Sequence, residues 1–182
     1  MAALGHSLCD VLVSGRVHEA TGLGRHAFAW ALAAELSGAV IWVQDAKTAE
    51  RPYPPGVRDL ADPAALIMVQ PSGALPVLQA IEEALRAGAA SLVVGVLERA
   101  PDLTESRRLQ LASGTGGGRG LCLVPEDALR SNAAETRWKC TSVPGSRGRQ
   151  HWEMIKNKRG RLGQWQVDLS PVPSVHGPVV AA

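Results

Sequence analysis

The chain has 182 residues, of which 46% are apolar, and its formal net charge is +2. This length allows one domain of ordinary size, and no apolar run reaches the roughly 18 residues that a membrane-spanning helix requires. The first residues also lack the basic start and long apolar stretch of a secretion signal, so we expect a soluble, cytoplasmic protein.

Cysteine and histidine positions argue against a metal centre. The three cysteines include no CxxC pair, and the five histidines are scattered without an HExxH motif. The sequence therefore predicts neither a disulfide framework nor a metal site.

The charge is unevenly distributed along the chain. Residues 137–161 carry eight basic side chains against Glu153 alone, a net charge of +7, whereas residues 1–136 carry a net charge of −4. Trp138, Trp152 and Trp165 lie in or near this basic segment. They could stack on nucleic-acid bases, but we favour apolar anchors of a solvated hairpin.

From the N-terminus, residues 9–15 predict a first short strand or edge segment. A short polar-to-apolar run then ends in glycines at Gly22 and Gly24, and residues 25–36 predict an Ala/Leu-rich helix that stops near Gly38. Strands of β-branched and apolar residues follow at 39–45 and 65–71, separated by a Pro-rich loop.

The second half of the chain continues the alternation of strands and helices. Helices are predicted at 74–88 and 103–113, the latter with Thr104 as its N-cap, and strands at 90–98 and 120–125. Three antiparallel strands then follow at 136–143, 150–158 and 164–170.

These elements predict an α/β fold with a doubly wound, mostly parallel sheet flanked by helices and extended by C-terminal antiparallel strands. We expect one domain over 1–170, with a basic hairpin segment at 137–169, and a disordered, Pro-containing tail at 171–182.

The stretch 16–36 has the strand, loop and helix context in which backbone N–H groups bind a nucleotide phosphate. The GK[ST] ending of such a loop is missing here. The sequence thus has the setting of a phosphate loop without the lysine and hydroxyl that the chemistry needs.

Several short stretches resemble the RecA-like ATPase core in order and spacing over nearly the whole chain. They are "GRVHEATG", "WVQDAK", "DPAALIMVQPSGALPVLQAIEEALRAGAASLVVGVLE" and "MIKNKRG". Within that superfamily the chain most resembles the ImuA family, RecA-like or SulA-like proteins of bacterial SOS mutagenesis cassettes. The features that carry this resemblance are "GRVHE", "YPPG", "EEALRAG", "LTESRRLQLA", "AAETRW" and "GQW".

The resemblance allows the catalytic positions to be compared one at a time. The stretch that matches the phosphate loop is shorter and ends in Ala27, which cannot ligate magnesium. Lys47 stands at the position of the catalytic glutamate, and Gly95 at that of the aspartate in the magnesium shell. The degenerate nucleotide loop consists of Gly22, Gly24, Arg25 and His26.

The resemblance therefore implies a pseudo-ATPase without cofactor or metal. In its family context we expect a non-catalytic accessory protein of translesion synthesis that works with RecA, with the inactive Y-family polymerase-like protein ImuB and with an error-prone polymerase. Such a protein would be bacterial, with nucleoid association left open. The alternatives are a SulA-like inhibitor of the division protein FtsZ, and a divergent ATP-binding protein whose site is rebuilt from Arg25, Asp45 and Glu98.

DNA contact is a further hypothesis. The stretches that match the DNA-binding loops of recombinases, 98–105 and 125–135, are short and carry one basic residue each, Arg99 and Arg130, so we do not expect strand exchange. Weak DNA binding, or an interface, is instead assigned to the basic segment. Lys156 and Lys158 resemble the pair that meets a neighbouring subunit's nucleotide, although an exposed strand face explains them equally well. The candidate residues are Arg137, Lys139, Lys156, Lys158, Arg159 and Arg161.

Overall fold

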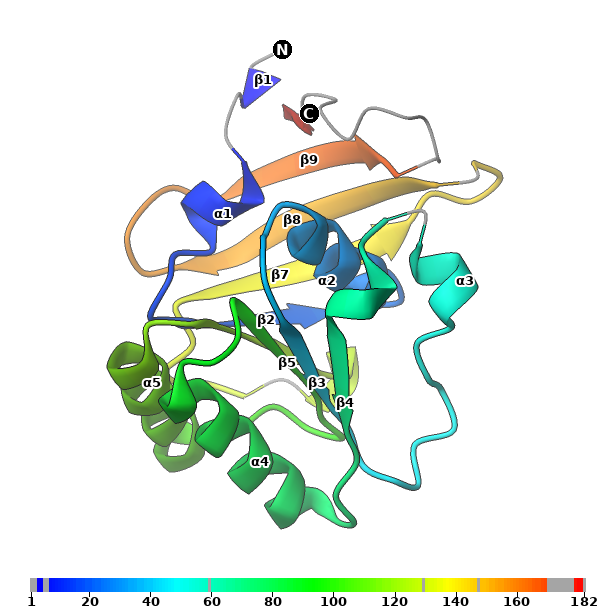
Figure 1. Cartoon of the computed structure of the whole chain (residues 1–182). Coiled ribbons are helices and arrows are strands. Elements are labelled where there is room, and N and C mark those ends of the chain that lie inside the picture. The colour runs from blue at the N-terminus through cyan, green and yellow to red at the C-terminus, as the bar shows by residue number, and fades with distance from the viewer. Residues whose placement is uncertain are drawn as a thin grey trace.

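One mixed sheet with helices on both faces forms the centre of the molecule (Figure 1). The computed structural model describes residues 3–4, 7–58, 60–128, 130–146, 148–169 and 179–181. Its strands are β1 (Ala3–Leu4), β2 (Val17–Thr21), β3 (Val40–Val43), β4 (Leu66–Val69), β5 (Leu92–Val96), β6 (Arg119–Leu123), β7 (Thr136–Ser142), β8 (Arg149–Asn157), β9 (Gly163–Asp168) and β10 (Val179–Ala181).

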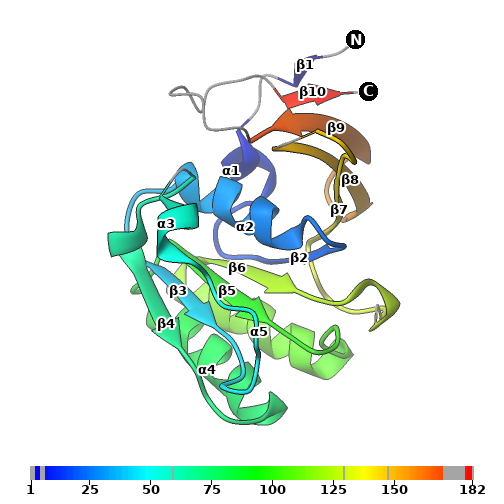
Figure 2. The same ribbon diagram turned by 90° about the vertical axis from the view of Figure 1, so that its right-hand side faces the viewer.

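The sheet has the strand order β1-β10-β9-β8-β7-β2-β6-β5-β3-β4. All pairings from β7 across to β4 are parallel, and those from β7 across to β1 are antiparallel. Figure 2 shows β7, β8 and β9 at the end of the sheet opposite β4. The predicted α/β class, with a parallel sheet extended by C-terminal antiparallel strands, is confirmed.

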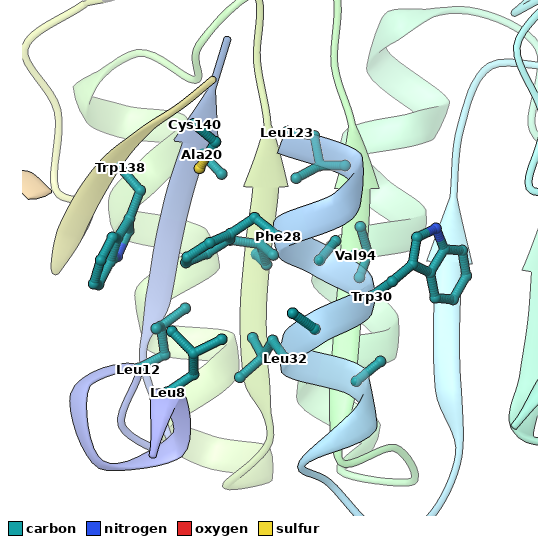
Figure 3. Packing of buried hydrophobic residues seen from close by; sticks show 14 of the residues in the cluster. Leu8, Leu12, Ala20, Phe28, Trp30, Leu32, Val94, Leu123, Trp138 and Cys140 are labelled. Carbon is teal, nitrogen blue, oxygen red and sulfur yellow. The ribbon is translucent and has the colours of Figure 1, made fainter. Parts of the chain in front are cut away.

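Helices cover the two faces of the sheet and create a core on each. They are α1 (Leu8–Val11), α2 (Arg25–Ala34), α3 (Pro54–Val57), α4 (Ala74–Ala87) and α5 (Leu103–Gly116), with 3-10 turns η1 (Pro63–Ala65) and η2 (Glu126–Ala128). Phe28 and Leu32 of α2 are fully buried against one face, beside Trp138 and Leu123 (Figure 3). Each large apolar side chain buried in this way contributes about 1.5–3 kcal/mol.

The opposite face is covered by α4 and α5. Val77, Ile81 and Leu85 lie at helical spacing on α4 and are buried with Leu109 of α5 and Cys122 of β6. Gly88 ends α4 in the left-handed conformation, with φ of +63°, where the sequence predicted its stop. No helix in the described ranges is long and apolar enough to cross a membrane.

The three tryptophans near the basic segment belong to the core. Trp138 and Trp152 are each 1% exposed and Trp165 is 5% exposed. The ring centroid of Phe28 lies 5.1 Å from that of Trp138 and 4.8 Å from that of Trp152. The apolar-anchor interpretation is confirmed, and these rings are not available to stack on bases.

Two predictions of local structure were wrong, and a third is only partly covered. Residues 8–11 form helix α1 rather than a strand, because Ser7 and Asp10 make a reciprocal capping box. Asp102, rather than Thr104, is the N-cap of α5, since its carboxylate accepts the Glu105 N–H at 2.8 Å. Of the predicted tail 171–182, Val179–Ala181 forms β10, and the rest lies outside the described residues.

Candidate functional site

The loop that matches a phosphate loop is three residues long and lies against β7. A Cβ at Gly22, where φ is +84°, would stand 2.3 Å from the Cys140 carbonyl oxygen, so only glycine fits. The Gly24 N–H donates to that same oxygen at 2.9 Å. A phosphate-binding loop needs its N–H groups free to point at the ligand. In this loop the Gly24 N–H is used by β7 instead.

Polar atoms around the loop are only partly satisfied. Arg25 folds back, and its Nη1 donates to the Gly22 carbonyl oxygen at 3.1 Å. Buried Thr21 Oγ1, Arg25 Nε and Gln150 Oε1 have no hydrogen-bond partner in the described part of the chain. Leaving such an atom unpaired costs about 1–3 kcal/mol, so a polar ligand that formed hydrogen bonds with these atoms would be favoured.

His26 belongs to an aromatic pocket beside the loop. Its ring stacks on Trp42 with centroids 5.9 Å apart, and Trp42 in turn stacks on Trp30 at 4.6 Å. Together with Tyr53 these rings line a cavity of about 280 Å³. Burial, reinforced by the neighbouring Arg25 charge, lowers the pKa of His26, which favours a neutral ring at pH 7.

Lys47 and Gly95, which the resemblance to RecA-like ATPases places at catalytic positions, both fit their surroundings. Lys47 is exposed on the turn after β3. Gly95 lies in β5, and a Cβ there would stand 2.3 Å from Cδ1 of Ile81 on α4. The missing side chain at position 95 therefore points into apolar packing, where a carboxylate would be both crowded and desolvated.

The alternative ATP-binding site would consist of Arg25, Asp45 and Glu98. The structure brings these three residues together only in part. Asp45 and Glu98 line one cavity of about 230 Å³ at the ends of β3 and β5, but Arg25 does not line it. The Asp45 carboxylate accepts N–H groups from Lys47 at 2.7 Å and Gly73 at 2.6 Å. These two bonds lower the pKa of Asp45, and they connect the segments that follow β3 and β4.

Two of the basic candidates form ion pairs on β7. Arg137 lies 2.6 Å from Glu19, and the two side chains are 12% and 2% exposed. Lys139 lies 2.5 Å from Glu126 at a more exposed position, and this contact raises the pKa of Lys139. Arg137 is therefore a largely covered cation with a structural partner.

The candidates at the end of β8 fold over the segment before β7. Lys156 and Lys158 donate to the carbonyl oxygens of Asn132 and Ala133, at 2.8 and 2.7 Å. Arg159 Nε lies 2.6 Å from Glu135. No partner of the Arg161 guanidinium is found among the described residues. Lys158 and Arg159 nevertheless stay exposed, so a contact with another molecule stays a prediction for them.

The acidic side of this network is not predicted from the sequence. Glu19 is 1% exposed in the middle of β2, where it accepts hydrogen bonds from Arg137 and Asn132. A carboxylate inside a short buried strand was the one available signal, because such a group needs a partner. The partners come from residues more than a hundred positions away, which spacing does not reveal.

Comparison with known proteins assigns the family. No protein-family model matches the chain. The chain is 32% identical over 196 residues to Protein ImuA of Caulobacter vibrioides, in strain NA1000 / CB15N and in strain ATCC 19089 / CIP 103742 / CB 15. The match covers 90% of this chain and 78% of the relative. The chain belongs to the ImuA family. The family resemblance read from the sequence is thereby confirmed.

In this ImuA-family chain the degenerate loop and the basic cluster of Lys156, Lys158 and Arg159 lie at opposite ends of the parallel strands. Lys139 is different, because it pairs with Thr21 at the end where the loop lies. The degenerate loop follows the carboxyl end of β2, as Lys47 follows that of β3. Asn157, just before Lys158, pairs with Thr136 at the amino end of β7, which runs parallel to β2. The loop and the basic cluster of one chain therefore cannot hold the same small ligand.

Proposed function

We propose that this ImuA-family chain is a non-catalytic accessory protein of SOS-induced translesion DNA synthesis. Its role would be that of an adaptor between RecA and the machinery of ImuB and the error-prone polymerase. Family membership is the observation that carries this proposal, since the match to Protein ImuA spans most of both chains. The mostly parallel sheet with helices on both faces is consistent with a RecA-like core.

The non-catalytic part of the proposal rests on the loop and its surroundings. The three-residue loop is pressed on β7, Ala27 offers no magnesium ligand, and an acidic side chain at position 95 would meet Ile81. A cation at position 47 cannot act as a general base at neutral pH without a large fall of its pKa. The chain would then act through its surface.

Direct binding tests the adaptor role. The tagged chain is titrated separately with purified RecA assembled on single-stranded DNA and with purified ImuB, and retention is followed on immobilised chain. We expect saturable binding to at least one of them, with a second partner joining in a ternary mixture. Heat-unfolded chain on the same surface controls for nonspecific retention. Absence of binding to both proteins would overturn the adaptor proposal.

A divergent ATP-binding protein is the second candidate. The unpaired Thr21 Oγ1 and Arg25 Nε beside the start of α2 favour it, because phosphate oxygens would accept from both groups. It predicts saturable ATP binding in a calorimeter that the substitution Arg25→Ala abolishes.

A further inference from the structure

An open groove of about 450 Å³ lies at the amino end of the parallel strands, at a distance from the degenerate loop. Four basic side chains line it: Arg16, Arg107, Lys158 and Arg159. Only the last two belong to the basic segment that the sequence singles out. Arg16 precedes β2 and Arg107 lies on α5, so the fold assembles the cluster from three distant parts of the chain.

The positive charge of the groove is only partly neutralised by carboxylates that line it. Among the described residues Glu135 is the one carboxylate that lines it, and its side chain is only 8% exposed. It lies 2.6 Å from Arg159 and 3.7 Å from Arg16. Those two arginines are still 56% and 39% exposed, and Lys158 gives one bond to a neutral carbonyl. Four cations against one carboxylate leave a net charge of +3 facing solvent.

Arg107 is the least constrained of the four. It is exposed on α5, and no hydrogen bond or ion pair of its guanidinium is found in the described part of the chain. The next residue, Arg108, is different, because it lies 2.7 Å from Glu82 of α4 and does not line the groove. Two adjacent arginines of one helix thus have different surroundings.

The groove has a net positive charge but few free hydrogen-bonding groups. Gln110 is the neutral polar side chain that lines it, and both ends of its amide are already used. Its oxygen accepts the Val17 N–H at 3.2 Å, and its nitrogen donates to the carbonyl oxygens of Val17 at 2.8 Å and Ala133 at 3.1 Å. A peptide backbone would find few free partners here. Phosphate groups can be bound by cations alone, and the planar guanidinium group of arginine matches their geometry.

We propose that this groove binds the phosphate backbone of DNA without reading its sequence. Arg107 and Lys158 supply the cations that are not engaged with Glu135, and Arg16 and Arg159 add to the field. Arg137, Lys139 and Lys156 take no part, because they lie outside the groove. This inference goes beyond the adaptor role and does not depend on it.

Fluorescence anisotropy of the full chain with a labelled DNA strand of mixed sequence, single or duplex, tests the proposal. For wild type we expect affinity to fall steeply between about 50 and 200 mM salt, because counterions are released on binding. Arg107→Ala should weaken binding several-fold and reduce the slope of log K against log salt by about 0.7 on single strands and about 0.9 on duplex. The double variant Arg107→Ala/Lys158→Ala should reduce it by about twice as much.

Arg108→Ala is the matched control, since it removes the same charge one residue away. We expect it to keep the wild-type salt slope, and both variants to keep the wild-type melting temperature. Equal losses for Arg107→Ala and Arg108→Ala would overturn the proposal in favour of general charge attraction. Absence of DNA binding by wild type at low salt would overturn it too. Polyglutamate that displaces DNA at equal charge concentration would reassign the groove to an acidic protein. These mixtures contain only the chain, DNA and competitor, so their failure leaves the adaptor proposal standing.

Discussion

His18 is a buried residue of β2 whose two ring nitrogens are both hydrogen bonded. Nε2–H donates to the Val13 carbonyl oxygen at 3.3 Å, and Nδ1 accepts from Thr136 Oγ1 at 2.8 Å. The Trp138 indole N–H donates to the same hydroxyl at 2.9 Å, which orients its proton towards His18. Burial lowers the pKa of His18 to about 4, so the folded chain holds this ring neutral.

A neutral buried histidine makes stability depend on pH. The unfolded chain binds a proton at His18 below pH about 6.5, and the folded chain only near pH 4, so stability is complete above 6.5 and falls as pH drops. The loss attributable to His18 approaches about 3 kcal/mol at pH 4. Urea unfolding at several pH values should show it, and His18→Gln should flatten the curve between pH 5 and 6.5. His26, whose pKa is also lowered, accounts for a residual slope. An unchanged slope in the variant would contradict this assignment.

Gly95 allows α4 to lie close to β5. We expect Gly95→Ala to lower the free energy of unfolding by about 1–3 kcal/mol, because its Cβ would overlap the end of Ile81 and force repacking. Gly114→Ala lies inside α5, and its Cβ would stand 3.9 Å or more from the nearest atoms outside that helix, so it should be neutral or stabilising by up to about 1 kcal/mol. Chemical denaturation compares the two. A harmless Gly95→Ala would show that position 95 tolerates a side chain.

At the scale of elements, hydrophobic pattern predicted most of the fold. β5 and α4 were predicted to within a few residues, since a continuous apolar run and a clear helical period leave little choice. β2 is not among the strands that hydrophobic pattern predicts, because His18 and Glu19 make "VHEAT" polar. His18 bonds to Thr136 and Val13, and Glu19 bonds to Arg137 and Asn132. Periodicity carries no information about such partners.

In the candidate site, too, some features can be predicted from the sequence and others depend on tertiary contacts. Residue types at the altered positions could be read from the sequence, but not that the loop closes on the Cys140 carbonyl group. The basic segment was visible as a charge run, whereas its division into buried, paired and exposed cations depends on tertiary contacts. Arg16 and Arg107 join the groove only through folding, and no local pattern distinguishes Arg107 from Arg108.

The β2 and β7 pair should depend on its buried ion pair. Arg137→Ala leaves Glu19 without its cation at 2% exposure, and we expect a loss of about 3–5 kcal/mol in the free energy of unfolding. Lys139→Ala, on the same strand but in an exposed pair, should cost no more than about 1 kcal/mol. The double variant Glu19→Gln/Arg137→Ala should recover part of the loss. Equal effects of Arg137→Ala and Lys139→Ala on urea unfolding would contradict a structural role for Arg137.

At the scale of the whole molecule, the length of the parallel strands separates the two surfaces that carry the proposals. The degenerate loop lies at the carboxyl end of the parallel strands and the basic groove at their amino end. The part of a ligand that lies in the groove therefore does not contact Arg25 or His26. Changes that weaken DNA binding through Arg107 should leave any property of the loop unaltered, which makes the two surfaces separable by mutation.

The effect of nucleotide on the melting temperature tests whether the loop still binds a ligand. A ligand present at 100 times its Kd stabilises a folded protein by about 2.7 kcal/mol, which shifts the melting temperature of a domain of this size by several degrees. Because the Gly24 N–H is held by β7 and Ala27 lacks a hydroxyl, we expect millimolar MgATP to leave the melting temperature unchanged. RecA measured in the same buffer serves as the positive control. A saturable shift that Arg25→Ala removes, while Arg108→Ala retains it, would show that the loop opens from β7 and would restore the nucleotide-binding alternative. If that shift persisted without magnesium, the loop would hold the triphosphate through Arg25 and the start of α2 alone, and binding would still not imply turnover.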